Sequence, residues 1–127
     1  MAGSSSDTAE DLASEFSRYS VHRGQFEKAI ETVLTGSVKA HVFLPSGRVL
    51  NTVVGRSGEE FIDPVKPFCS CKNFFFGVLG GRNGTCYHLL SYSIAEEAGK
   101  LDKVRMHDEE FESFVSLLIH DLVAEGR

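Results

Sequence analysis

The amino-acid sequence predicts an α+β fold in which a small antiparallel β-meander is packed by N- and C-terminal helices. Apolar residues recur at helical spacing near both ends of the chain, most clearly at Phe111, Phe114, Val115, Leu118, Ile119 and Leu122. From residue 38 the period changes to alternation, with Val38, Ala40 and Val42 on one side. Turn residues at 45–47 and 57–58 then divide this stretch into two or three short strands.

The helices can be placed from their periodicity and their capping residues. They are expected at residues 7–19, 25–34, 72–79 and 86–98 and from residue 108 onward. Ser6 or Asp7 is expected to cap the first helix, and His107 or Asp108 the last. Gly99 is expected to stop the helix before it. Residues 1–6 are small and polar, so we expect them to be disordered and assign 7–127 to a single domain.

Composition and charge limit the classes of function. A net charge of −5 argues against a protein that wraps nucleic acid over its whole surface. A mildly basic middle, residues 37–106, lies between two acidic ends. No apolar run approaches the ~20 residues of a membrane helix, and no signal peptide is evident, so no membrane contact is expected. Three cysteines in tight spacing favour metal ligation in a reducing compartment over a disulfide framework.

All three cysteines fall in one motif with a histidine. Cys69-x-Cys71 is followed, after fourteen residues, by Cys86-x-His88. Zinc prefers four ligands in a tetrahedron, with thiolate and imidazole as its usual donors. Residues two apart on an extended segment point to the same side, so Cys69 and Cys71 can coordinate one ion. Cys86 and His88 can converge at a helix entrance, with Cys86 just outside the helix and His88 in its first turn.

The number of candidate ligands bears on the kind of site. Four ligands with no spare cysteine indicate a closed site for one structural zinc ion, whereas a catalytic zinc usually keeps one position open for water. A hydrolytic zinc enzyme is the competing reading. It requires a bound water, which the spectrum of a cobalt-substituted sample would reveal.

The motif and its surroundings resemble a known family. The Cys-x-Cys…Cys-x-His pattern, preceded by a strand meander and followed by an apolar helix, resembles the SWIM zinc finger, which would span about residues 53–91 in a ββα-like arrangement. The likeness extends through 45–48, 53–55, 74–79 and 88–90 to roughly residues 24–122. It is greatest to the small stand-alone SWIM proteins of the Shu type, which include archaeal relatives of similar size.

The resemblance implies a role in homologous recombination and DNA repair. Shu-type SWIM proteins pair with RecA-like recombinase paralogues, which are ATPases. The resemblance implies that this chain would bind DNA either directly or through that partner. The chain would then be an adaptor rather than an enzyme. It would work in the cytoplasm with the nucleoid in a prokaryote, or in the nucleus in a eukaryote. Tyr87 departs from the family pattern, in which a basic residue is common before the histidine, and this weakens the expectation of phosphate contact there.

Several other residues are candidates for binding. Arg48, Lys72 and Arg82 are the candidate nucleic-acid contacts for the alternative in which the chain binds DNA directly. Leu117 and Val123 lie off the stripe of the last helix and are candidates for a partner surface.

Two groups of aromatic residues have both a structural and a functional interpretation. The phenylalanines at 68, 74, 75 and 76 are either a platform for stacking bases or, as we favour, core around the metal site. His22, His41 and His120 have no companions at ligand spacing, so we expect them to lie at the surface or to be partly buried.

Overall fold

The fold is an α+β arrangement around a five-stranded mixed sheet, in a computed structural model that describes residues 8–55, 58–72, 74, 78–79, 81 and 85–124, with the backbone alone at 123–124. The strands are β1 (Val38–Leu44), β2 (Arg48–Gly55), β3 (Gly58–Asp63), β4 (Phe68–Cys69) and β5 (Asp102–His107). The α-helices among the described residues are α1 (Ala9–Glu15), α2 (Phe26–Leu34), α3 (Tyr87–Ala98) and α4 (Phe111–Ala124). Short 3-10 helices, η1 (Ser17–Val21) and η3 (Asp108–Glu110), precede α2 and α4.

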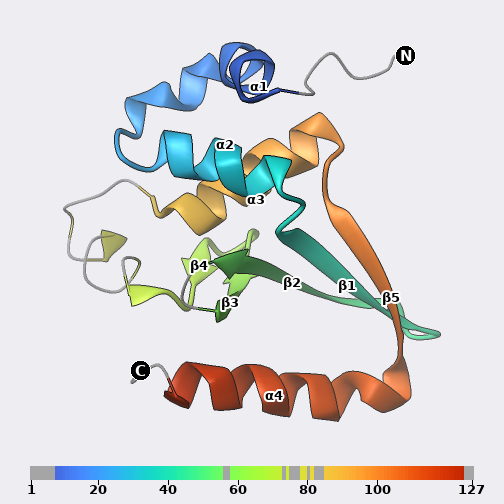
Figure 1. Cartoon of the computed structure of the whole chain (residues 1–127). Helices are drawn as coiled ribbons and strands as arrows, with labels where there is room; N and C mark the ends of the chain where they lie inside the picture. The colour runs from blue at the N-terminus through green and yellow to red at the C-terminus, as the bar shows by residue number, and fades with distance from the viewer. Residues whose placement is uncertain are drawn as a thin grey trace.

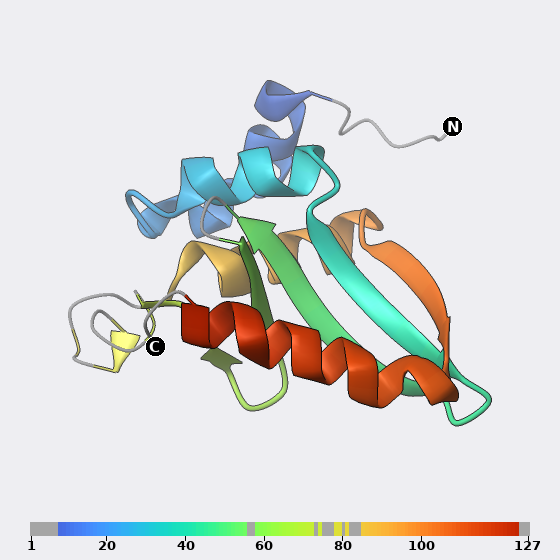
Figure 2. The same cartoon turned by 60° about the horizontal axis from the view of Figure 1, so that its bottom comes forward.

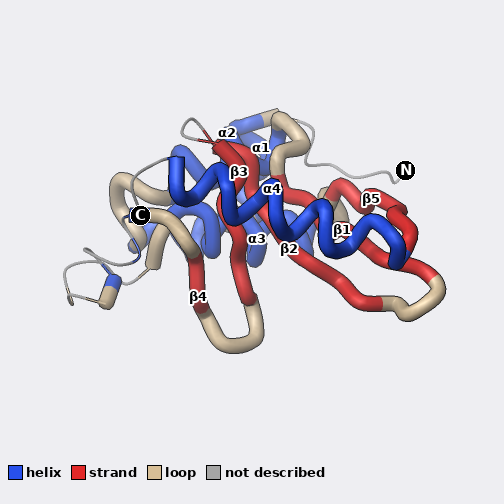
Figure 3. The backbone as a smooth tube through the Cα atoms, turned by 90° about the horizontal axis from the view of Figure 1, so that it is seen from below, coloured by secondary structure: helices blue, strands red, loops and turns tan. Residues whose placement is uncertain are grey.

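Helices cover both faces of the sheet, whose order is β4-β3-β2-β1-β5 (Figure 1). α1, α2 and α3 lie on one face, and α4 runs across the other beneath β3, β2 and β1 (Figures 2 and 3). The main core lies on the three-helix face, where apolar side chains of the helices meet those of the strands. Its residues include Leu12, Phe16, Ile30, Val33, Val38, Val53, Ile62, Leu90 and Ile94.

The predicted antiparallel meander is confirmed for β1, β2 and β3, but the whole sheet is mixed. β5 pairs parallel with β1, with Lys39 opposite Asp102 and Leu44 opposite His107. β4 adds a short antiparallel edge beyond β3, with Ile62 opposite Cys69. Neither strand was predicted from the sequence. β5 is an edge strand rich in charged residues, so its apolar alternation is weak.

The helices mostly lie where they were predicted, with differences at their ends. The first helix is capped by Thr8, whose Oγ1 accepts from the Asp11 N–H, rather than by Ser6 or Asp7. It ends at Glu15 and continues as the 3-10 helix η1 instead of running unbroken to residue 19. α3 ends where Gly99 adopts a left-handed conformation with φ of 70°, as expected. Half of the predicted helix 72–79 and all of residues 1–6 lie outside the described residues.

The last helix starts as predicted but buries only part of its stripe. His107 caps η3 in a capping box, in which the His107 N–H donates to the Glu110 carboxylate at 2.8 Å. Leu118 is buried, whereas Ile119 of the same apolar stripe is 53% exposed. α4 crosses the sheet alone, and a single helix against a sheet buries a narrower strip than one packed among other helices.

Candidate metal centre

Two chain segments bring the four predicted ligands together at one end of the sheet. Cys69 ends β4 and pairs with Ile62 of β3, while Cys71 follows two residues later. Cys86 is the N-cap of α3 with an extended backbone, and His88 lies in the first turn of that helix. The expected arrangement, with Cys86 outside the helix and His88 just inside it, is therefore confirmed.

The four ligand atoms form a compact buried cluster. All of them lie within 4.8 Å of one another. Cys69 and Cys86 are fully buried, and Cys71 and His88 are 4% and 6% exposed. In a tetrahedral zinc site with Zn–S bonds of about 2.3 Å, the sulfur atoms lie about 3.8 Å apart. The described donors are therefore close to the spacing that one zinc ion requires.

The surroundings favour negative charge on the sulfur of Cys71, whereas the pKa values of the Cys69 and Cys86 thiols are raised. The Phe74 N–H donates to the Cys71 Sγ at 3.3 Å, and the Leu89 N–H donates to the Cys86 thiol from the first turn of α3. Hydrogen bonds from Cys69 and Cys86 hold the pKa of Cys71 far below its usual range. The hydrogen bond with Cys71 correspondingly raises the pKa of Cys69. A thiolate stabilised in this way is the form that binds metal.

One atom of the cluster lacks a partner. Nδ1 of His88 is buried and has no hydrogen bond within the described part of the chain. A buried polar nitrogen without a partner is costly, so it is expected to meet a ligand or an ordered water. The donor set, its spacing and this nitrogen all fit a single zinc ion.

A buried polar contact fixes the segment between the first two ligands. Ser70 lies between Cys69 and Cys71, and its hydroxyl donates to the Glu60 carboxylate at 2.7 Å. The same hydroxyl accepts from the Phe61 N–H at 3.0 Å, and the Ser70 N–H donates to the Phe61 carbonyl at 3.0 Å. Ser70 and Glu60 are both buried, at 6% and 2% exposed. This contact ties the Cys69–Cys71 segment to β3, and neither Ser70 nor Glu60 was predicted as a site residue from the sequence.

Gly55 closes the other side of the centre. A Cβ atom there would lie 2.6 Å from the Tyr87 hydroxyl oxygen and 3.1 Å from Nε2 of His88. The end of β2 therefore packs directly against the first turn of α3, and a side chain at position 55 would require Tyr87 and His88 to shift.

The phenylalanines near the centre pack with it. Phe74 is 5% exposed, and its ring meets that of Phe68 edge-on with centroids 5.4 Å apart. Phe68 is half-buried and also contacts Phe61 of β3. These two rings match the core interpretation, while residues 75 and 76 lie outside the described residues.

The two candidate nucleic-acid residues that the structure describes, Lys72 and Arg48, lie at different places in the fold. Lys72 is exposed directly after Cys71. Arg48 lies at the other end of β2, roughly 23 Å along the strand from Gly55, where its guanidinium lies 3.9 Å from the Phe111 ring centroid and 3.8 Å from an Asp108 oxygen. Arg82 lies outside the described residues.

Only one of the two candidate partner residues can be placed. Leu117 is 67% exposed on α4, as expected for a residue off the apolar stripe. The Val123 side chain lies outside what the structure describes.

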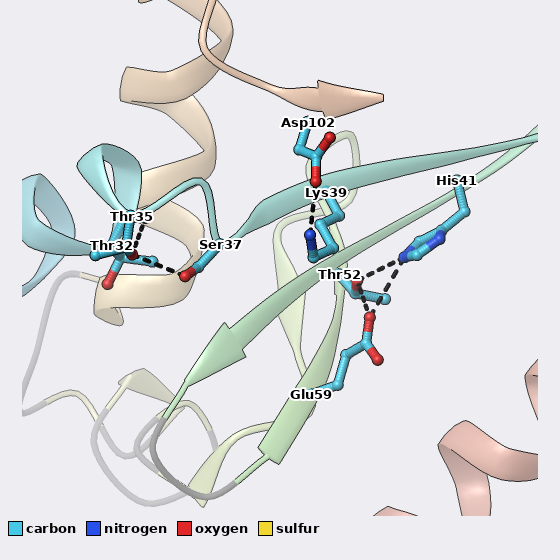
Figure 4. A network of polar contacts seen from close by, with 8 residues as sticks. All are labelled: Thr32, Thr35, Ser37, Lys39, His41, Thr52, Glu59 and Asp102. Atoms are coloured by element: carbon cyan, nitrogen blue, oxygen red, sulfur yellow. Dashed lines mark hydrogen bonds and ion pairs between the residues drawn. The ribbon is translucent and has the colours of Figure 1, made fainter. Parts of the chain in front are cut away.

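A second polar cluster lies under α4 and was missed in the sequence. His41 is 5% exposed, so the expectation of a surface or partly buried histidine there is wrong. Its Nε2 lies 2.9 Å from the Thr52 Oγ1 and 3.3 Å from the Glu59 Oε2, and Thr52 donates to the same carboxylate oxygen at 2.5 Å (Figure 4). The Phe114 ring covers the imidazole, with centroids 4.5 Å apart.

The buried histidine is explained by strand alternation. In a half-buried strand each face shows every second residue, and His41 shares a face with Phe43, which is fully buried. α4 covers this face, so the three side chains join β1, β2 and β3 beneath the helix, and His41 contacts α4 through the Phe114 ring.

Comparison with protein-family models, curated proteins and solved structures gives no match for the chain. Within the described residues, none of the helices is both long and apolar enough to span a membrane.

Proposed function

We propose that this chain is a SWIM-type adaptor whose single structural zinc fixes a surface for a RecA-like recombinase paralogue in homologous recombination and repair. The observation that carries the structural role is the closed donor set, in which three thiols and one imidazole are all buried and within 4.8 Å of one another. Four protein donors complete a tetrahedron and leave no position for a reacting water. The SWIM-like pattern of these same residues supports the choice of partner.

The bound ion would join parts of the fold that are distant in sequence. Cys69 ends β4 and Cys71 follows it, whereas Cys86 caps α3 and His88 lies in its first turn, and α3 packs on α2. Zinc would supply the cross-link between these two segments and contribute several kcal/mol, on the order of what small structural sites provide. Residues of the chain position the ligands. The Ser70–Glu60 hydrogen bond holds the Cys69–Cys71 segment, and Gly55 leaves room for His88.

The test is metal content together with folding. Purified native protein is expected to carry one zinc per chain by native mass spectrometry, and His88→Ala and Cys86→Ser are expected to lose both zinc and cooperative unfolding. His120→Ala is the matched control, because His120 is exposed on α4. A folded, reduced protein without metal would overturn the structural zinc. Co-purification of a RecA-like ATPase with the wild type, reduced in His88→Ala, is expected if the adaptor role holds.

A direct DNA-binding role is the second candidate, and the exposure of Lys72 beside Cys71 favours it. It requires a DNA affinity that falls steeply with salt and weakens in Lys72→Ala. Lys103→Ala is the control, because Lys103 is exposed on β5. An affinity that is flat with salt removes this candidate.

A further inference from the structure

A groove lies between α1 and α2, and these two helices lie on the opposite side of the sheet from α4 (Figure 1). The groove has a volume of about 580 Å³. Its floor is apolar, with Ala9 and Ala13 from α1 facing Phe26, Ile30 and Leu34 from α2. The two alanines are four residues apart, and the three larger residues repeat every four, so each helix contributes one continuous stripe. The small side chains on α1 leave the space that α2 does not fill.

The rim of this groove carries charge of one sign. Glu10 of α1 and Glu27 and Glu31 of α2 all line it, and no lysine or arginine is among its lining residues. The three carboxylates are exposed, and none of them joins an ion pair within the described part of the chain. An apolar floor between unpaired carboxylates favours an occupant that is apolar on one side and basic at its edges.

We propose that this groove, here called the α1–α2 groove, docks a basic amphipathic helix of a partner protein. The inference rests on the adaptor function proposed above and names its surface and the chemistry of its partner segment. α2 is 9 residues long, or about 13 Å at a rise of about 1.5 Å per residue. That length accommodates apolar anchors of a partner helix at i, i+4 and i+7, with lysines or arginines on either side meeting the glutamates.

Charge argues against a second copy of this chain as the occupant. Among the α4 side chains that the structure describes, the large apolar ones that are exposed are Leu117 and Ile119, at 67% and 53%. α4 holds Glu112 and Asp121 but no lysine or arginine, so its charge repels that of the α1–α2 groove. Residues 1–7 of the chain also contain no lysine or arginine. These charges favour a segment of another protein as the occupant.

The experiment uses full-length, zinc-loaded protein and a synthetic fluorescein-labelled peptide of about 14 residues, with leucines at i, i+4 and i+7 and lysines at the edges. Fluorescence anisotropy is expected to show saturable binding. Replacing the leucines by serine, or the lysines by glutamate, is expected to weaken it by about tenfold or more. The double variant Glu27→Lys/Glu31→Lys is expected to bind the original peptide more weakly to a similar degree. It should bind the glutamate peptide more tightly than the wild type does.

The matched control is Glu112→Lys/Asp121→Lys, which makes the same change of charge on α4. It is expected to bind the basic peptide like the wild type. If both double variants bound the basic peptide equally weakly, or if the serine peptide bound as tightly as the leucine peptide, binding would reflect only general attraction between opposite charges. Either result would overturn the proposal that the α1–α2 groove is the binding site. Chemical shift changes confined to α4 in the bound protein would do the same.

Failure of the groove and failure of the adaptor role give different results. If the peptide binds at the groove but no RecA-like ATPase co-purifies, the groove stands and the identity of the partner is wrong. If such an ATPase binds wild type and Glu27→Lys/Glu31→Lys equally, the adaptor role stands and the α1–α2 groove is not its surface.

Discussion

Gly55 and His88 lie in direct contact, since a Cβ atom on Gly55 would come within 3.1 Å of Nε2 of His88. The two residues are on different elements, β2 and α3, and 33 positions separate them in the sequence. The position of a candidate zinc ligand is therefore set by a strand that contributes no ligand itself. Because the backbone of Gly55 is extended, a larger residue there would cause a steric effect without backbone strain.

Replacing Gly55 by alanine is expected to weaken metal binding without abolishing the fold. The new methyl group would press on the Tyr87 hydroxyl at 2.6 Å and on the His88 ring at 3.1 Å. Displacing a ligand from its supporting contacts typically costs on the order of tenfold in affinity. Competition with a chromophoric chelator measures this. Val49→Ala, at the far end of β2, is the control, and an unchanged affinity in Gly55→Ala would show that His88 does not need this contact.

Ser70→Ala is expected to destabilise the protein by about 1–3 kcal/mol, because it removes a buried donor from Glu60 and an acceptor from the Phe61 N–H. Chemical denaturation of the zinc-loaded protein measures the change. Ser93→Ala is the comparison, since the Ser93 hydroxyl makes only a 3.4 Å contact within its own helix. Equal stability of the two variants would contradict the role of Ser70 in holding β4 to β3.

The ligands were predictable because metal chemistry constrains residue type and spacing locally. Cys69 and Cys71 share one side of an extended segment, and Cys86 caps the helix that carries His88, so four positions in the sequence define the cluster. The supporting residues carry no such signature. Ser70 and Gly55 look like ordinary strand and turn residues until β3 and α3 are placed against them.

The strands at the two edges of the sheet also could not be predicted from local sequence patterns. β1, β2 and β3 are neighbours in sequence and joined by short turns, so alternation and turn residues suffice to predict them. β5 reaches β1 only after α3 has crossed the sheet, and its parallel pairing depends on contacts 63 positions apart, as between Lys39 and Asp102. The burial of His41 could not be predicted for the same reason. It results from α4 covering one face of the sheet, and the alternation of β1 does not show that this face is covered.

Glu59→Gln is expected to make stability less sensitive to acid. The hydrogen bond from His41 lowers the pKa of Glu59 from its usual 4.5, against the opposing effect of burial. A carboxyl with a lowered pKa in the folded state stabilises the protein above the unfolded pKa, and that stability is lost as the pH falls through the folded value.

The difference between wild type and Glu59→Gln should therefore be greatest near neutral pH, at about 1 kcal/mol for a partly exposed carboxylate. It should shrink as the pH falls below about 4.5. Urea denaturation between pH 3 and pH 7, in a range first checked for metal retention, measures it. Glu112→Gln on the exposed side of α4 is the control, and a difference that grows in acid would contradict the assignment.

Arg48→Ala is expected to lower stability while leaving any DNA affinity unchanged. The Arg48 guanidinium lies 3.9 Å from the Phe111 ring centroid and faces Asp108, whose carboxylate accepts from the Ser46 N–H and hydroxyl at 2.9 and 2.7 Å. These contacts fasten the β1–β2 turn to the start of α4, and an exposed cation over a ring contributes about 0.5–1 kcal/mol. Thermal unfolding should therefore shift in Arg48→Ala and not in Lys72→Ala, because Lys72 is exposed beside the metal centre. If Arg48→Ala weakened DNA binding at unchanged stability, the β1–β2 turn rather than the metal centre would be the nucleic-acid surface.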